Sequence, residues 1–94
     1  MILERDVEGF LVRKVEEQGG RCEKFNPDND NGMPDRIVML PGGLLIWVET
    51  KRAETEHKRK LQQAQCVLLR RLGQRVATCH TKAEVLALLA SVTP

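Results

Sequence analysis

The stretch GMPDRIVMLPGGLLIWVETK, residues 32–51, contains two apolar runs separated by a short turn. Residues 36–40 and 44–50 are rich in Ile, Val, Leu and Trp, the residue types that favour strands. The tripeptide Pro-Gly-Gly at 41–43 is typical of a tight connection between them. The stretch therefore predicts an antiparallel hairpin.

Charged residues stand at the two ends of this hairpin that should meet. Asp35 opens the first strand, and Glu49 and Lys51 close the second. Antiparallel pairing brings the start of one strand beside the end of the other, so we expect these residues at one edge of the sheet. Alternation along the strand predicts that Glu49 and Lys51 project from the same side, while the Thr50 side chain points away.

The segment before the hairpin predicts a helix, a short strand and a loop. Apolar residues at helical spacing predict a helix over the first 18 residues, ended by Gly19-Gly20; they are Leu3, Val7, Phe10, Leu11 and Val15. Residues 21–25 form a short extended candidate, and NPDNDNG at 26–32 has the composition of a loop. Asp28 and Asp30 are interpreted as loop residues that satisfy turn backbone, in preference to metal ligands.

The segment after the hairpin predicts helix, strand and helix. Residues 58–72 form the first helix, whose apolar stripe is Leu61, Ala64, Leu68 and Leu72, and Gly73 ends it. Residues 75–79 form a fourth strand, and the capping-box spacing of Thr81 and Glu84 starts the last helix. The order αβββαβα predicts a single domain over residues 1–94 of the α/β (α+β) class, with a mixed four-stranded sheet flanked by helices.

Composition limits the class of protein. The chain has 94 residues, 41% of them hydrophobic and 30% charged, which is typical of a soluble globular domain with a mainly aliphatic core. No apolar run approaches the roughly 20 residues of a membrane span, so we expect no membrane association and a cytosolic location. The three cysteines are widely spaced and are interpreted as reduced thiols. A chain this short makes a dimer plausible.

The charged residues of the hairpin are of the types that phosphodiester hydrolysis uses. Asp35 and Glu49 would supply hard oxygen ligands for Mg²⁺, and Thr50 would offer its backbone carbonyl to the same ion. Lys51 would orient or deprotonate the attacking water, or stabilise the charge that develops on the phosphoryl group.

Two further residues are candidates for this site. Glu4 lies on the edge of the core-facing stripe of the first helix and would add a third acid. Gln62 follows the hairpin closely enough to face the sheet near Lys51, where an amide would hold a phosphate or a water molecule.

Each of these signals also has an ordinary structural interpretation. Glu56-His57-Lys58 repeats the Glu-x-Lys pattern, but we place it in a charged loop with no strand before it and reject it. His57 and His80 are interpreted as solvated or capping residues. The basic run from Lys51 to Lys60 would be a solvated face in most proteins; beside a phosphate site we favour contact with the DNA backbone. That run contributes Arg52, Lys58, Arg59 and Lys60.

The residues together resemble a known family. Gly-x-Pro-Asp-Arg at 32–36, the hairpin, Glu-x-Lys at 49–51 and Gln62 ahead of Leu72-Gly73 are similar to the virus-type replication-repair nuclease family, VRR-NUC, a branch of the PD-(D/E)xK nuclease superfamily. The resemblance covers nearly the whole chain, with Glu4 and Val7, Gly19-Gly20 and Lys24 in matching order. It departs after Lys51, where RAETEHKRK is charged instead of turn-like.

The resemblance implies a Mg²⁺- or Mn²⁺-dependent DNA endonuclease in which Asp35 and Glu49 bind metal, Lys51 serves catalysis, and Glu4 and Gln62 complete the site. Lys24 and Arg36 join the basic run as expected DNA contacts. Stand-alone members look like phage or bacterial proteins and are similar to Holliday-junction resolvases, which implies a homodimer acting on branched DNA in replication or repair. A flap or nonspecific nuclease of the same fold, and a DNA-binding module without catalytic activity, remain alternatives.

Overall fold

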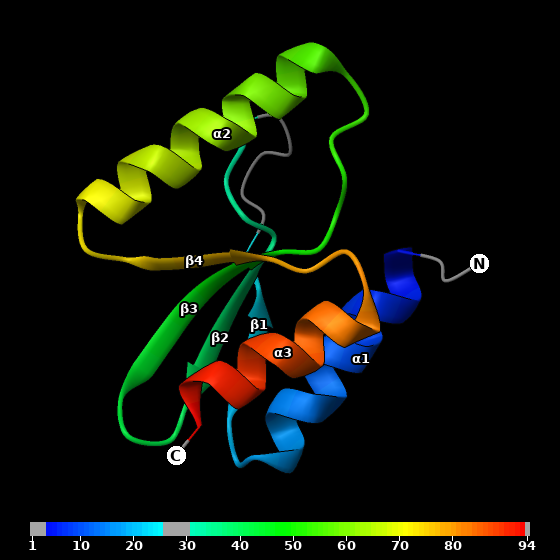
Figure 1. Cartoon of the computed structure of the whole chain (residues 1–94), viewed down its shortest axis with the longest axis vertical. Coiled ribbons are helices and arrows are strands. Elements are labelled where there is room, and N and C mark those ends of the chain that lie inside the picture. The colour runs from blue at the N-terminus through cyan, green and yellow to red at the C-terminus, as the bar shows by residue number, and fades with distance from the viewer. Residues whose placement is uncertain (1–3, 26–30, 94) are drawn as a thin grey trace.

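The computed structural model describes residues 4–25 and 31–93, with side chains from residue 6 onward. Its elements run in the order α1 (Glu4–Glu17), β1 (Arg21–Lys24), β2 (Arg36–Leu40), β3 (Leu44–Glu49), α2 (Glu56–Arg71), β4 (Arg75–Thr78) and α3 (Lys82–Val92). The predicted order αβββαβα and the α+β class are therefore confirmed. Figure 1 shows α1 and α3 side by side on one part of the molecule and α2 on the other side of β4.

The four strands form one mixed sheet in the order β1-β2-β3-β4. β1 and β2 are antiparallel, as are β2 and β3, and β3 pairs with β4 in parallel after the crossover through α2. In the hairpin, Arg36 lies opposite Val48 and Leu40 opposite Leu44. This register leaves Asp35 and Glu49 at the same end of the neighbouring strands.

The core lies between one face of the sheet and the helices α1 and α3. Alternate residues of the central strands point into it, including Val38, Ile46 and Val48. The α1 residues Val7, Leu11 and Val15 are buried as their helical spacing predicted, and Val85 and Leu89 of α3 complete the core. Burying these aliphatic side chains is the main driving force for this half of the fold.

The opposite face of the sheet is covered less completely, and α2 packs on this side. The structure describes every residue of α2, and of these Leu69 alone is buried. Leu68 and Leu72, on the apolar stripe of the sequence, are 51% and 67% exposed. The helical period was correct, but the leucine stripe faces outward because polar residues of α2 face the sheet.

The start of α2 also differs from prediction. Thr55 caps the helix by accepting a hydrogen bond from the Lys58 N–H at 3.1 Å, so Glu56-His57-Lys58 is its first turn and not a loop. The predicted cap of α3 is confirmed, since Thr81 accepts from the Glu84 N–H and Glu84 accepts from the His80 N–H. No helix within the described ranges has the length and hydropathy needed to cross a membrane.

Candidate active site

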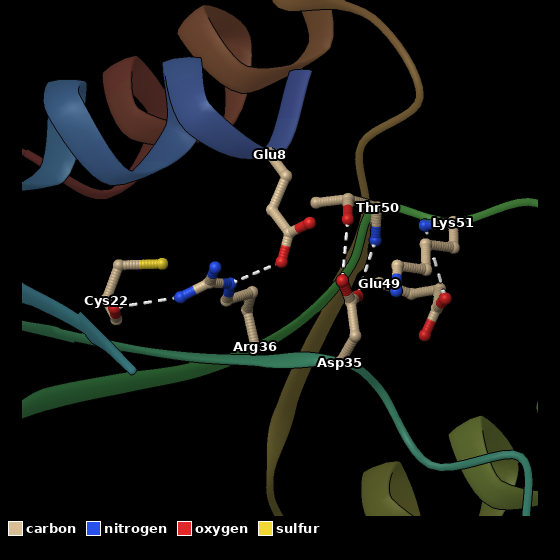
Figure 2. Close-up of polar contacts among 7 residues, drawn as sticks. All are labelled: Glu8, Cys22, Asp35, Arg36, Glu49, Thr50 and Lys51. Carbon is tan, nitrogen blue, oxygen red and sulfur yellow. Dashed lines mark hydrogen bonds and ion pairs between the residues drawn. The ribbon is translucent and has the colours of Figure 1, made fainter. Parts of the chain in front are cut away.

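Two carboxylates meet where β2 begins and β3 ends. Asp35 directly precedes β2 and Glu49 is the last residue of β3, and both are buried, at 7% and 6% exposure. Because Arg36 pairs with Val48, the neighbouring residues Asp35 and Glu49 lie on the same face of the sheet. The juxtaposition predicted from the hairpin is therefore present, and Figure 2 shows both side chains at this edge.

Asp35 is held by Thr50, in contradiction to the prediction that the Thr50 side chain points away. The Thr50 N–H donates to one Asp35 oxygen at 2.8 Å, and the Thr50 hydroxyl donates to the other at 2.7 Å (Figure 2). Regular alternation fails here because β3 ends at Glu49, so it no longer dictates the direction of the next side chain. Both hydrogen bonds go to a charged acceptor, which makes them stronger than neutral ones.

Glu49 is an unusually basic carboxylate. Burial raises its pKa from the ordinary 4.5 to about 8, and the nearby charge of Asp35 adds to the rise. The backbone N–H groups of Lys51 and Asp35 and the Lys51 charge act in the opposite direction without offsetting it. Among the residues that the structure describes, these two buried acids lack a full counter-charge, which is the situation that a bound cation relieves.

The donor set fits a hard divalent cation. Mg²⁺ is commonly held by one or two carboxylates, with phosphate oxygens and water filling the remaining positions. Asp35 and Glu49 supply two such groups, and each Asp35 oxygen that accepts from Thr50 keeps a further lone pair. Within residues 6–25 and 31–93 no cluster of three or more His, Cys, Asp or Glu forms. Glu4 begins α1, and its side chain lies outside the described residues.

Lys51 and Gln62 lie beside Glu49, as predicted. The Lys51 N–H donates to a Glu49 carboxylate oxygen at 3.2 Å, and its exposed side chain is close enough to lower the pKa of Glu49. The Gln62 amide approaches the same oxygen at 3.5 Å, at the limit for a hydrogen bond. Gln62 comes from α2, so the site joins the hairpin to the helix that follows it.

Contacts with the loop before β2, which the sequence did not reveal, hold α2 close to Glu49. The Gln65 amide donates to the Asn31 carbonyl at 2.8 Å. Gly32 has a positive φ of 80°, and a Cβ placed there would lie 2.5 Å from the Leu61 carbonyl carbon. The loop before β2 therefore packs directly on the backbone of α2, at the peptide that joins Leu61 to Gln62. The glycine of the Gly-x-Pro-Asp motif was the available signal, but its partner depends on tertiary structure.

Arg36 lies on the opposite face of the sheet from Asp35. Its guanidinium pairs with Glu8 of α1 at 2.7 Å and donates to the Cys22 carbonyl at 3.3 Å (Figure 2). The side chains of Arg36 and Glu8 are 16% and 14% exposed, so this ion pair is largely shielded from solvent. Glu8 was recognisable as the next acid on the stripe of Glu4, yet its partner could not be predicted.

The other expected DNA contacts lie at the surface. Lys24, at the end of β1, and Arg52, Arg59 and Lys60 are exposed, and Lys58 is half-buried. Ion pairs join Lys58 to Glu54 at 3.7 Å and Arg59 to Glu56. Exposed pairs of this kind contribute little to stability, so their cations can exchange partners. Asp28 and Asp30 lie outside the described residues.

A phage protein is similar in sequence to part of this chain. No protein-family model matches the chain. A protein of Acyrthosiphon pisum secondary endosymbiont phage 1 named "Putative nuclease p44" is 43% identical over 51 residues, which is 54% of this chain and 55% of that protein. The match thus spans about half the length of this curated relative.

A solved structure extends the similarity to nearly the whole chain. The structure titled "VRR_NUC domain" superposes on this chain with a TM-score of 0.83 and 26% sequence identity, covering 96% of this chain and 97% of that one. The αβββαβα order and the mixed sheet match its fold. The resemblance of this chain to the VRR-NUC family, predicted from its motifs, is thereby confirmed.

Proposed function

We propose that this chain is a divalent-metal-dependent nuclease that hydrolyses DNA phosphodiesters at the Asp35–Glu49 site. The observation that carries the proposal is the pair of buried carboxylates, with the pKa of Glu49 raised to about 8. A buried, undercompensated acid pair costs stability and is retained mainly where it binds a cation or reacts. The name of the phage relative, "Putative nuclease p44", supports the same activity.

Each residue of the site has a distinct role in this proposal. Asp35 and Glu49 bind Mg²⁺ or Mn²⁺, and Thr50 orients the Asp35 carboxylate through its two hydrogen bonds. When bound, the cation would neutralise charge on the phosphoryl oxygens and lower the pKa of a water molecule. Lys51 orients that water or stabilises the negative charge of the transition state, and Gln62 positions water or a phosphate oxygen next to Glu49.

Contacts with the DNA backbone come from the segment between β3 and α2. Arg52, Arg59 and Lys60 are exposed close in sequence to Lys51, and phosphate neutralisation by such residues dominates nonspecific affinity for nucleic acid. Lys24 is exposed at the end of β1 and extends the proposed contact surface. For Arg36 we retain a DNA contact as a proposal, although its guanidinium is engaged by Glu8.

We further propose that the protein acts as a homodimer on branched DNA, with a four-way junction as the preferred substrate. Two symmetric incisions need two active sites, which a dimer with twofold symmetry supplies. The outer face of α2, defined by Leu68 and Leu72, supports a second copy as the partner, because large exposed leucines on one helix face favour association. The phage origin of the relative supports a role in phage or bacterial replication or repair, in the cytosol of the bacterial cell.

The decisive experiment compares the parent protein with Asp35→Asn on a synthetic four-way junction, a flap, single-stranded DNA and a plain duplex, in Mg²⁺ or Mn²⁺. We expect the parent to cut the junction fastest and the variant to bind DNA without cutting it. Equal cleavage by both proteins would remove the active-site assignment. Binding without cleavage by the parent would favour the alternative, a DNA-binding module without catalytic activity, and preference for the flap or duplex would favour a nuclease of different selectivity.

A further inference from the structure

The face of α2 that turns toward the sheet is polar and lines a cleft. The cleft has a volume of about 350 Å³ and lies between α2, the loop before β2 and the ends of β3 and β4. From α2 it receives residues that recur at three- and four-residue spacing, namely Arg59, Gln62, Gln63, Cys66 and Arg70. A helix normally buries its apolar face against a sheet. In α2 the leucines Leu68 and Leu72 face outward, and polar residues of the helix line a hollow. This arrangement indicates a ligand site.

The cleft is continuous with the candidate active site. Glu49 and Gln62 belong to its lining as well as to the carboxylate site. A molecule in the cleft would therefore adjoin any phosphodiester held at Asp35 and Glu49. Its occupant is expected to be a part of the same DNA strand that is cut, next to the scissile bond.

The lining provides the groups that a nucleotide requires. Arg59 and Arg70 bring two guanidinium groups, and each keeps free N–H donors beyond its contact with Glu56 or with the Val76 carbonyl. Pro34 and Val67 offer apolar surface to a base. Two cations beside an apolar wall, next to a phosphodiester site, match the charge and shape of one nucleotide.

We propose that this cleft binds one unpaired nucleotide of the cleaved DNA strand, adjacent to the scissile phosphate. The proposal rests on the proposed nuclease function and specifies the substrate: the strand must be free of its complement at that position, as at a branch or an end. The volume lies near the lower end of the range for small-ligand pockets, about 300–1,000 Å³, and suits a single nucleotide and not a base pair.

Cys66 allows binding to be measured without cleavage. It lines the cleft and is half-buried, whereas Cys22 and Cys79 are buried. Burial raises the pKa of all three thiols, and for Cys22 and Cys79 to about 11, so Cys66 should react first with iodoacetamide. The rate of Cys66 alkylation, followed by mass spectrometry in EDTA, reports access to the cleft.

The probes are single-stranded oligothymidylate about ten nucleotides long, within the usual site size for single strands, and a fully paired duplex of equal length. At a concentration ten times its dissociation constant, the single strand should slow Cys66 alkylation about tenfold, and the duplex should leave it unchanged. Equal protection by the duplex, or no protection by the single strand, would overturn the proposal.

A matched pair of variants tests whether the guanidinium of Arg70 binds the nucleotide in the cleft. Arg70 lines the cleft and the neighbouring Arg71 does not, so Arg70→Ala and Arg71→Ala remove the same charge at adjacent positions. We expect Arg70→Ala to weaken protection about tenfold, as for loss of a charge-assisted hydrogen bond, and Arg71→Ala to leave it unchanged. Equal effects of the two substitutions would show that Arg70 acts only through its general positive charge. That result would overturn its assignment as a nucleotide contact. If the single strand protects Cys66 but Asp35→Asn still cleaves DNA at the parent rate, the proposed active site would be wrong and the proposed nucleotide cleft would stand.

Discussion

Thr50 binds both oxygens of the Asp35 carboxylate, through its N–H at 2.8 Å and its hydroxyl at 2.7 Å. The contact fixes the rotation of one carboxylate at the junction of β2 and β3. Thr50 is 1% exposed, so water cannot substitute for its hydroxyl without rearrangement. The geometry of the proposed metal site therefore depends on a residue that lies between Glu49 and Lys51 and carries no charge.

Thr50→Val tests this dependence, because valine keeps the shape of threonine and removes the hydroxyl. We expect metal affinity and cleavage to fall about 10–100-fold, the usual cost of losing a hydrogen-bond partner of a metal ligand. Metal affinity is measured by calorimetric titration with Mn²⁺. Thr50→Ser keeps the hydroxyl and should retain most activity; a loss in Thr50→Ser as large as in Thr50→Val would show that packing, not the hydrogen bond, is responsible.

Glu49→Gln tests how much the buried Glu49 carboxylate destabilises the metal-free protein. Between pH 4.5 and about 8 the folded chain holds a proton on Glu49 that the unfolded chain has released. The folded state binds more protons in this window, so the free energy of unfolding falls as pH rises through it. Removing the acid should stabilise the protein at pH 9 by roughly 1–3 kcal/mol, with no difference near pH 4.

The measurement is denaturant unfolding in EDTA, with Glu84→Gln as a control of opposite sign. The hydrogen bond from the His80 N–H lowers the pKa of Glu84, so its contribution is present at neutral pH and is lost as pH falls through the lowered value. Mg²⁺ or Mn²⁺ should raise the melting temperature of the parent and not of Glu49→Gln. A parent that is equally stable at all pH values would refute the burial argument.

Gly32→Ala tests the contact that sets the position of α2. The new Cβ would lie 2.5 Å from the Leu61 carbonyl carbon, so α2 must shift and Gln62 must move relative to Glu49. Gly42→Ala is the matched control, since Gly42 also has a positive φ but a Cβ there meets nothing within 4 Å. The control should lose about 1 kcal/mol of stability and no activity. Gly32→Ala should lose more stability, and cleavage besides, as measured by unfolding and by a junction assay.

A triple variant tests the proposed contact with the DNA backbone; it combines Lys58→Ala, Arg59→Ala and Lys60→Ala. If each cation neutralises one phosphate, the slope of the logarithm of affinity against the logarithm of salt should fall by about 0.9 per contact on duplex DNA. Fluorescence anisotropy at several salt concentrations gives this slope. Arg13→Ala with Lys14→Ala on α1 controls for general loss of positive charge, and an equal change in that variant would assign the α2 run to an ordinary solvated surface.

Leu68→Glu with Leu72→Glu tests the outer face of α2. Charges in an association interface should prevent dimer formation, so light scattering should report a dimer for the parent and a monomer for the variant. Leu86→Glu places the same charge on α3, at a leucine that is also 50% exposed, and should leave the dimer intact. A parent that remains monomeric at all concentrations would refute the homodimer proposal.

The sequence alone predicted the order of elements and the meeting of Asp35 with Glu49, because both depend on local signals. Periodicity, glycines and the Pro-Gly-Gly turn set the helices and the hairpin, and antiparallel pairing then fixes which ends lie together. The core residues of α1 followed for the same reason. The resemblance to the VRR-NUC family rested on these same short motifs.

The direction of the Thr50 side chain and the orientation of α2 were decided by tertiary structure. Strand alternation predicts a side-chain direction only while the strand continues, and β3 ends one residue before Thr50. Helical periodicity gives a stripe but not the surface that it meets; the leucines of α2 face outward because Gly32 and Gln65 hold its polar side against the loop and the cleft. Such close contacts between distant segments depend on how the elements pack in space, which no local pattern encodes.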